Sequence, residues 1–189
     1  ILSNIDFIES REYIVFCSEK TLEVFDGISN ERLASISTEF EISVVKNLKS
    51  LNIIVICGQT KRGLRLFKFL EDTLVPLLTI PLDNLANWVM KIEFIPITNR
   101  IVLSGKGFLK VVGIDENKVL ISLDIADFIC DIIFFSDILI LGYYNSAQVK
   151  LFNPSSLEEI SSIKVAHKWL KKVVYQASGS LILTLCESE

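Results

Sequence analysis

The side chains that could do chemistry in this chain are few, and they do not fall into a catalytic spacing. Among the 189 residues there is one histidine, His167, which could act as a general base or bind a metal. No serine lies in the Gly-x-Ser-x-Gly turn of a serine hydrolase. Residues 104–107 read Ser-Gly-Lys-Gly, which is too short for a phosphate-binding loop and has no helical pattern after it. We interpret that segment as a hairpin turn.

Aspartates and cysteines are the other candidates for a catalytic or metal-binding cluster. The aspartates are Asp124, Asp127, Asp131 and Asp137. Alternation along a strand and an intervening turn would spread them along a sheet, so we expect them at solvated loop and edge positions. The four cysteines, at 17, 57, 130 and 186, form no Cys-x-x-Cys pair, which favours structural thiols over a metal or redox site. The sequence therefore predicts no metal, no cofactor and no enzymatic activity in this segment.

A repeat of 40 to 45 residues organises the chain and must position these side chains. Four segments share the order apolar, charged, apolar, apolar and end at residues 25, 67, 112 and 152, which are 42, 45 and 40 positions apart. The segments are Leu22-Glu23-Val24-Phe25, Leu64-Arg65-Leu66-Phe67, Leu109-Lys110-Val111-Val112 and Val149-Lys150-Leu151-Phe152. Such a period predicts a solenoid or a propeller. We expect the last residue of each segment to be buried between neighbouring units.

Each repeat unit is predicted to contain four short strands, because runs of Ile, Val, Leu and Phe alternate with turns rich in Gly, Asn, Asp and Pro. In the clearest unit the expected strands are 88–94, 100–103, 108–112 and 119–123. No stretch carries a convincing helical period over three turns, so helical repeats are excluded. The chain is therefore expected to be all-β, with antiparallel strands joined by tight turns.

Four strands in about 40–45 residues resemble the blade of a WD-repeat propeller. Ala166-His167 stands where a WD repeat has Gly-His, Ala177-Ser178-Gly179 stands at its turn, and Phe25-Asp26 stands for Trp-Asp. The resemblance implies a β-propeller of four-stranded antiparallel blades with degenerate repeats, and a structural role for His167. It implies about four and a half blades in this chain. Their approximate limits are 1–39, 40–83, 84–125, 126–165 and a partial 166–189.

A propeller usually closes its ring with four to eight blades, which leaves only short and protected strand edges. About four and a half blades in an open arc would leave apolar sheet faces and strand edges uncovered at both ends. We therefore expect the chain to be part of a longer protein, or to have a partner that completes the ring.

The charge and the cysteines of the chain indicate which partners it could bind and in which compartment it is expected. The net charge is −4, and the basic clusters are short, so binding to nucleic acid is not expected. No stretch of about 18 apolar residues is present, so no transmembrane span is predicted. The absence of a cysteine framework and of Asn-x-Ser/Thr sites favours an intracellular protein, in the cytoplasm or the nucleus.

Protein recognition is the function that remains. Trp88 and Trp169 open equivalent first strands and could be core or contact residues, with core burial favoured. If they are exposed, tryptophan beside lysine is a composition enriched at binding hot spots. The candidate partner-binding residues are Trp88, Lys91, Lys168, Trp169, Lys171 and Lys172. We expect them on the face built from the loop before each first strand and the hairpin between strands two and three.

Lysines on such a face would steer an acidic or phosphorylated segment of a partner. The predicted function is a non-catalytic scaffold for protein–protein interaction. The alternative is a regulatory or targeting propeller attached to a larger enzyme, such as a kinase or a ubiquitin ligase, and a catalytic propeller is the least favoured interpretation.

Overall fold

The computed structural model describes residues 2–8, 13–83, 87–165, 169–176 and 181–187, and for residues 2–8 and Lys49 it describes the backbone alone. The described part is built from antiparallel strands, and its helical segments are three 3₁₀ turns. These turns are Lys49–Leu51, Thr60–Arg62 and Pro96–Thr98. Within the described ranges, no helix is long and apolar enough to cross a bilayer.

The first two sheets contain four strands each, in chain order. Unit 1 consists of β1 (Leu2–Ile8), β2 (Tyr13–Ser18), β3 (Thr21–Asp26) and β4 (Arg32–Ser37). Unit 2 consists of β5 (Val44–Leu48), β6 (Ile53–Cys57), β7 (Leu64–Leu70) and β8 (Thr73–Ile80). Each strand pairs with the next one along the chain, because short turns bring consecutive strands side by side.

Units 3 and 4 form one continuous six-stranded sheet, because one long strand belongs to both. The strands are β9 (Val89–Ile95), β10 (Arg100–Gly113), β11 (Lys118–Phe135), β12 (Ile138–Tyr143), β13 (Gln148–Phe152) and β14 (Glu159–Lys164). The first half of β10 pairs with β9 and its second half with β11. The first half of β11 likewise pairs with β10, and its second half, from Ile129, pairs with β12. Unit 3 therefore contains β9, β10 and the first half of β11, and unit 4 contains the second half of β11 with β12, β13 and β14. Unit 5 is the hairpin of β15 (Leu170–Gln176) and β16 (Leu181–Cys186).

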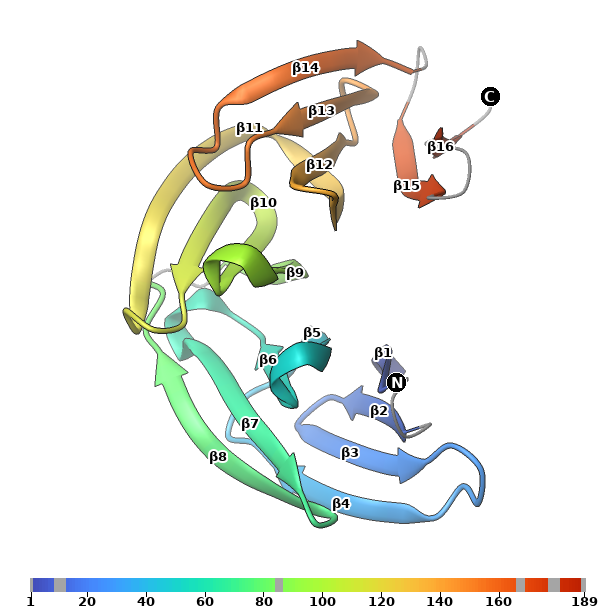
Figure 1. The fold of residues 1–189 in the computed structure, drawn as a ribbon, viewed down its shortest axis with the longest axis vertical. Coiled ribbons are helices and arrows are strands. Elements are labelled where there is room, and N and C mark those ends of the chain that lie inside the picture. Colours follow the sequence, from blue (N-terminus) through green and yellow to red (C-terminus); the bar gives the residue numbers. More distant parts are fainter. Residues whose placement is uncertain (1, 9–12, 84–86, 166–168, 177–180, 188–189) are drawn as a thin grey trace.

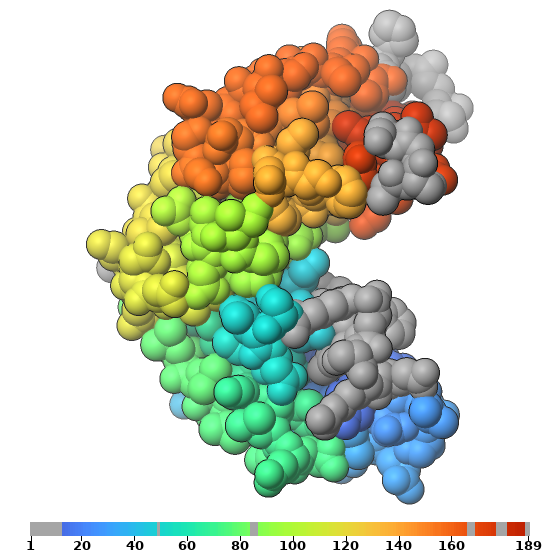
Figure 2. All heavy atoms as spheres, in the orientation of Figure 1, coloured from blue at the N-terminus to red at the C-terminus, as the bar shows by residue number. Residues whose placement is uncertain are grey.

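The five units follow one another around an open arc (Figure 1). The strands β1, β5, β9 and β15 lie toward the concave side, and β4, β8 and β14 lie on the convex outer side (Figure 1). Neighbouring first strands are in contact along the concave side: β1 with β5, β5 with β9, β9 with β11, and β11 with β15. In the space-filling view the blue residues of unit 1 and the orange and red residues of units 4 and 5 do not meet (Figure 2).

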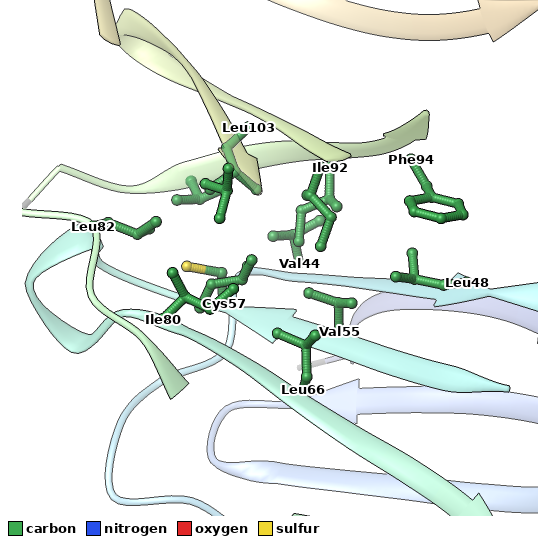
Figure 3. Packing of buried hydrophobic residues seen from close by; sticks show 14 of the residues in the cluster. Val44, Leu48, Val55, Cys57, Leu66, Ile80, Leu82, Ile92, Phe94 and Leu103 are labelled. Carbon is green, nitrogen blue, oxygen red and sulfur yellow. The ribbon is translucent and has the colours of Figure 1, made fainter. Parts of the chain in front are cut away.

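The core lies between the units, because each strand alternates its side chains between the two faces of its sheet. In β6, Ile54 and Ile56 pack against unit 1, whereas Val55 and Cys57 pack against unit 3. Figure 3 shows the junction of units 2 and 3, where side chains of unit 2, such as Val55, point toward those of unit 3. Both faces of an internal sheet are thus apolar, which explains the near-continuous apolar runs in the sequence.

The expected burial of the four aligned segments is mostly confirmed. Phe67, Val112 and Phe152 are buried, with Val112 fully excluded from solvent. Phe25 is only half-buried, and the expectation is wrong there. The reason is its place in unit 1, where the side of the sheet that carries Phe25 and its neighbour Phe16 faces away from unit 2 and has no packed neighbour among the described units.

Candidate partner-binding face

Both tryptophans lie at the surface, where each precedes the first strand of a unit. Trp88 comes directly before β9 and is 38% exposed, and Trp169 comes directly before β15 and is 44% exposed. The favoured interpretation that these rings belong to the core is therefore wrong. The inward positions at these strand starts are taken instead by Val89 and Leu170, which are fully buried. The two indoles are consequently free to contact another molecule.

Tyr144, in the loop between β12 and β13, contacts Trp169 and lines the same hollow as Trp88. Its ring stacks on Trp169, with ring centres 6.1 Å apart and planes at 4°, and meets Phe128 edge to face at 6.0 Å. Such pairs are more favourable than their buried area alone, by about 0.5–1.5 kcal/mol. Lys171 lies over the same ring, with its Nζ 5.0 Å from the ring centre. The result is an aromatic cluster of Phe128, Tyr144 and Trp169 that the sequence pattern did not indicate.

Lys171 is the one predicted lysine that the structure describes beside this aromatic cluster. Its ammonium forms an ion pair with Glu187 at 2.8 Å and donates a hydrogen bond to the Tyr144 hydroxyl at 3.4 Å. These hydrogen bonds, to Glu187 first and then to Tyr144, raise the pKa of Lys171. The ammonium therefore carries its charge across the physiological range and stays fixed near the stacked rings.

A hollow of about 580 Å³ lies on the Trp88 side of Tyr144, between units 3 and 4. Its lining is mostly apolar and comes from the start of β9, the middle of β10 and β11, and the loop after β12. The lining residues are Asn87, Trp88, Met90, Lys106, Phe128, Tyr144 and Asn145. We call this the aromatic hollow. A smaller and more polar hollow of about 200 Å³ lies on the other side of Trp88, lined by Lys20, Glu39, Phe40, Glu41, Gln59, Arg62 and Trp88.

Asp127 fixes the loop that carries Tyr144 and Asn145. One carboxylate oxygen accepts hydrogen bonds from the backbone N–H groups of Phe128 and Asn145 and from the Asn145 amide, and the other accepts one from the Ser146 N–H. Burial acts to raise the pKa of Asp127, but the donors from Asn145 and Ser146 outweigh it and hold the pKa below its usual value. The expectation of a merely solvated aspartate missed this anchoring role.

Gly105 and the Trp88 backbone approach each other so closely that no side chain fits between them. A Cβ on Gly105 would collide with the Trp88 carbonyl oxygen and would lie 2.5 Å from the Phe108 ring. Residues 104–107, predicted as a hairpin turn, are instead strand residues of β10, and at Gly105 the Trp88 backbone packs against this strand. Lys106, the next residue, lines the aromatic hollow.

Lys91 and Lys172 do not lie beside the aromatic hollow. They line a separate groove of about 370 Å³ between the first strands of units 2 to 5. Both form ion pairs with Asp131, at 3.3 Å to Oδ1 and 3.1 Å to Oδ2, and Asp131 also accepts a hydrogen bond from the Val173 N–H at 3.1 Å. Asp131 is only 4% exposed, so its expected solvated position is wrong. Three neighbouring units converge on its carboxylate because their first strands lie side by side on the concave side.

Two sequence-predicted residues cannot be placed. His167, the expected structural histidine, and Lys168, a predicted partner-binding residue, lie outside the described residues. Of the six predicted partner-binding residues, the described structure brings Trp169 and Lys171 together and leaves Trp88 across the aromatic hollow, with Lys91 and Lys172 in the concave groove.

The cysteines are free thiols, and three of them are buried. Burial raises the pKa of Cys57 to about 12 and that of Cys130 to about 11. Each donates its S–H to a carbonyl oxygen at 3.3 Å, Cys57 to Gly63 and Cys130 to Gly142. Such thiols are protonated and inert near neutral pH. In the part of the chain that the structure describes, no three or more His, Cys, Asp and Glu side chains could together hold a metal ion.

The chain resembles known proteins in structure but not in sequence. No protein-family model and no curated protein sequence matches the chain. Its structure is similar to that of Sqt1 from Saccharomyces cerevisiae, with a TM-score of 0.81 and 14% sequence identity over 98% of this chain and 56% of Sqt1. It is also similar to the computationally designed protein Ika8, with a TM-score of 0.75 and 16% identity over 98% of this chain and 55% of Ika8. The chain thus spans about half the length of these two proteins, and the likeness establishes the fold alone.

Proposed function

We propose that the chain is an arc of a WD-repeat-like propeller and serves as a non-catalytic scaffold that binds other proteins. The proposed blades are 1–39, 40–83, 84–125, 126–165 and a partial 166–189. The repeated order of antiparallel strands and the similarity to the Sqt1 structure support a WD-repeat-like fold. An intracellular location, in the cytoplasm or nucleus, belongs to this proposal, and the free thiols fit it.

The observation that carries the proposal is the exposed aromatic surface around Tyr144. Trp88 and Trp169 keep more than a third of their surface in water although buried apolar neighbours adjoin both of them. Exposing large aromatic rings costs free energy, and tryptophan, tyrosine, phenylalanine and methionine are enriched where proteins bind each other. Loops placed on a rigid scaffold commonly carry such contacts. A partner would desolvate these rings.

The proposed partner is an acidic or phosphorylated protein segment. Trp169 acts as the anchor, and the Lys171 ammonium, held beside it, attracts the negative charge. Trp88 belongs to the proposed surface, and Lys168, which lies outside the described residues, remains a predicted member of it. Lys171 is already paired with Glu187, but that carboxylate is exposed and an acidic partner could replace it. Lys91 and Lys172 would contribute less, because the carboxylate that both of them bind, Asp131, is buried.

The test is a double substitution, Trp169→Ala with Lys171→Glu, in the protein used to capture partners quantitatively from its native cells. We expect binding to weaken by about 2–4 kcal/mol, since anchors at interface hot spots contribute on this scale. Ile97→Ala is the matched control, because Ile97 is 65% exposed and lies past the opposite end of β9. Partners bound equally well by both variants, at an unchanged melting temperature, would contradict the proposed surface.

A further inference from the structure

The proposed function leaves open what enters the aromatic hollow between Trp88 and Tyr144. Resting on that function, we infer that the hollow receives one large apolar side chain, aromatic or methionine-like, from an extended protein segment that carries an acidic residue beside it. The segment would lie across units 3 and 4 on the face that carries both tryptophans.

The apolar part of the inference follows from the lining of the hollow. Trp88 and Met90, at 38% and 44% exposed, line it together with Phe128 and Tyr144. Its volume of about 580 Å³ falls within the range of about 300–1,000 Å³ typical of ligand sites, and it exceeds what one ordered water needs. Methionine is flexible and polarizable, so Met90 can adapt to an aromatic or aliphatic guest. A large apolar side chain is therefore the guest that gains most from entering.

The exposure of this hollow does not come from the open ends of the arc. It lies between units 3 and 4, and both units have packed neighbours on their two sides. By contrast, Leu181, Leu183 and Leu185 of β16 are exposed, and among the described residues their unit packs against unit 4 alone. The apolar lining of the hollow would thus stay exposed whatever covered the two ends.

The acidic part of the inference follows from the charges around the hollow. Lys106 is the one charged residue among the lining residues, is exposed, and makes no ion pair with any described residue. Asp127, in β11 beside this lining, is negatively charged, but its two carboxylate oxygens already accept hydrogen bonds from the N–H groups of Phe128 and Ser146. The negative charge of Asp127 is therefore stabilised by N–H donors, whereas the positive charge of Lys106 is paired with no described carboxylate. An acidic residue next to the apolar guest would supply the missing opposite charge.

A selection from a phage-displayed library of random peptides tests this pairing directly. We expect the wild-type protein to enrich peptides in which Phe, Trp, Met or Leu lies next to Asp or Glu. Met90→Glu places a charge in the hollow and should abolish this enrichment. Lys106→Glu should shift the neighbouring position from acidic to basic residues. Ile97→Glu is the matched control and should behave as the wild type, since Ile97 lies outside the lining.

A synthetic copy of the most enriched peptide then gives the size of the effect. We expect it to bind Met90→Glu and Lys106→Glu at least about tenfold more weakly than the wild type, which corresponds to about 1.4 kcal/mol. Enrichment that survives Met90→Glu, or peptides without an acidic preference, would overturn the inference. So would the absence of any enrichment.

The proposed function and this inference fail in different ways. If Trp169→Ala with Lys171→Glu loses its cellular partners while no peptide is selected at the hollow, the scaffold function stands and the inference is wrong. If the double variant keeps every partner, the proposed surface itself is wrong. Peptides selected at the hollow that also displace a captured cellular partner support both.

Discussion

Asp131 is the residue whose replacement should most clearly separate the units of the arc. Its carboxylate joins Lys91 of β9, its own strand β11, and both Lys172 and the Val173 N–H of β15. We consider Asp131→Asn, which keeps the size of the side chain and removes its charge. We expect the variant to be less stable, and β15 and β16 to loosen from unit 4.

The expected loss of stability depends on how exposed the two lysine partners of Asp131 are. Two charges about 3 Å apart attract by about 5 kcal/mol at an effective dielectric constant of about 20, but burying the carboxylate costs several kcal/mol in return. Removing one partner of a fully buried pair costs about 3–5 kcal/mol, because a charge is then stranded. Here the lysine side chains are 36% and 53% exposed and can return to water. We therefore expect a loss of about 1.5–3 kcal/mol, the range for hydrogen bonds to charged groups.

Urea unfolding followed by tryptophan fluorescence measures this loss, and hydrogen exchange of the β15 amides shows where it falls. Asp137→Asn is the matched control, because Asp137 is an exposed aspartate in the turn between β11 and β12 with φ of 64°, a conformation that asparagine tolerates. Lys172→Met in both backgrounds then isolates the pair, and we expect a coupling of about 1 kcal/mol.

Equal stabilities of Asp131→Asn and Asp137→Asn, within about 0.5 kcal/mol, would refute this reasoning. A large loss in Asp131→Asn with no coupling to Lys172 would refute the contribution of that ion pair, because the loss would then come from Lys91 and from the backbone hydrogen bond of Val173.

Three further predictions concern the core and the aromatic hollow. Leu66→Asp should unfold the chain, because Leu66 is 1% exposed and an unpaired buried charge costs several kcal/mol; a circular dichroism spectrum unchanged from the wild type would contradict this. The lowered pKa of Asp127 predicts a contribution to stability that is present above the usual carboxyl pKa of about 3.9 and is lost as the pH falls through the lower folded value. Asp127→Asn should thus lower the melting temperature at neutral pH and flatten its acid dependence, and a parallel acid limb in both proteins would exclude this. Gly105→Ala should shift Trp88 and change its fluorescence emission, since a Cβ there meets the Trp88 carbonyl; an unchanged spectrum and stability would show that the backbone yields without cost.

The sequence predicted most of the strands and their order along the chain, but it separated 100–103 from 108–112, which lie in one strand, β10. Each unit repeats the same alternation of apolar side chains and turn residues, and these are local properties that a run of about five residues expresses. Consecutive strands pair because their turns are short, so the predicted strand at 119–123 and the one it faces in β10 are found paired. The repeat period also indicated correctly that Phe67, Val112 and Phe152 lie in the core.

The surroundings of the functional side chains depend on how the sheets pack in three dimensions. Periodicity placed Trp88 and Trp169 at the start of equivalent strands, but it could not show that the residue after each tryptophan occupies the inward position. Nor could it bring Tyr144 against Trp169, because that contact depends on how the loop after β12 sits against unit 5. The hydrogen bond from Val173 to Asp131 joins residues 42 positions apart. Such contacts depend on the angle and distance between neighbouring sheets, which packing in three dimensions sets and the alternation within one strand does not encode.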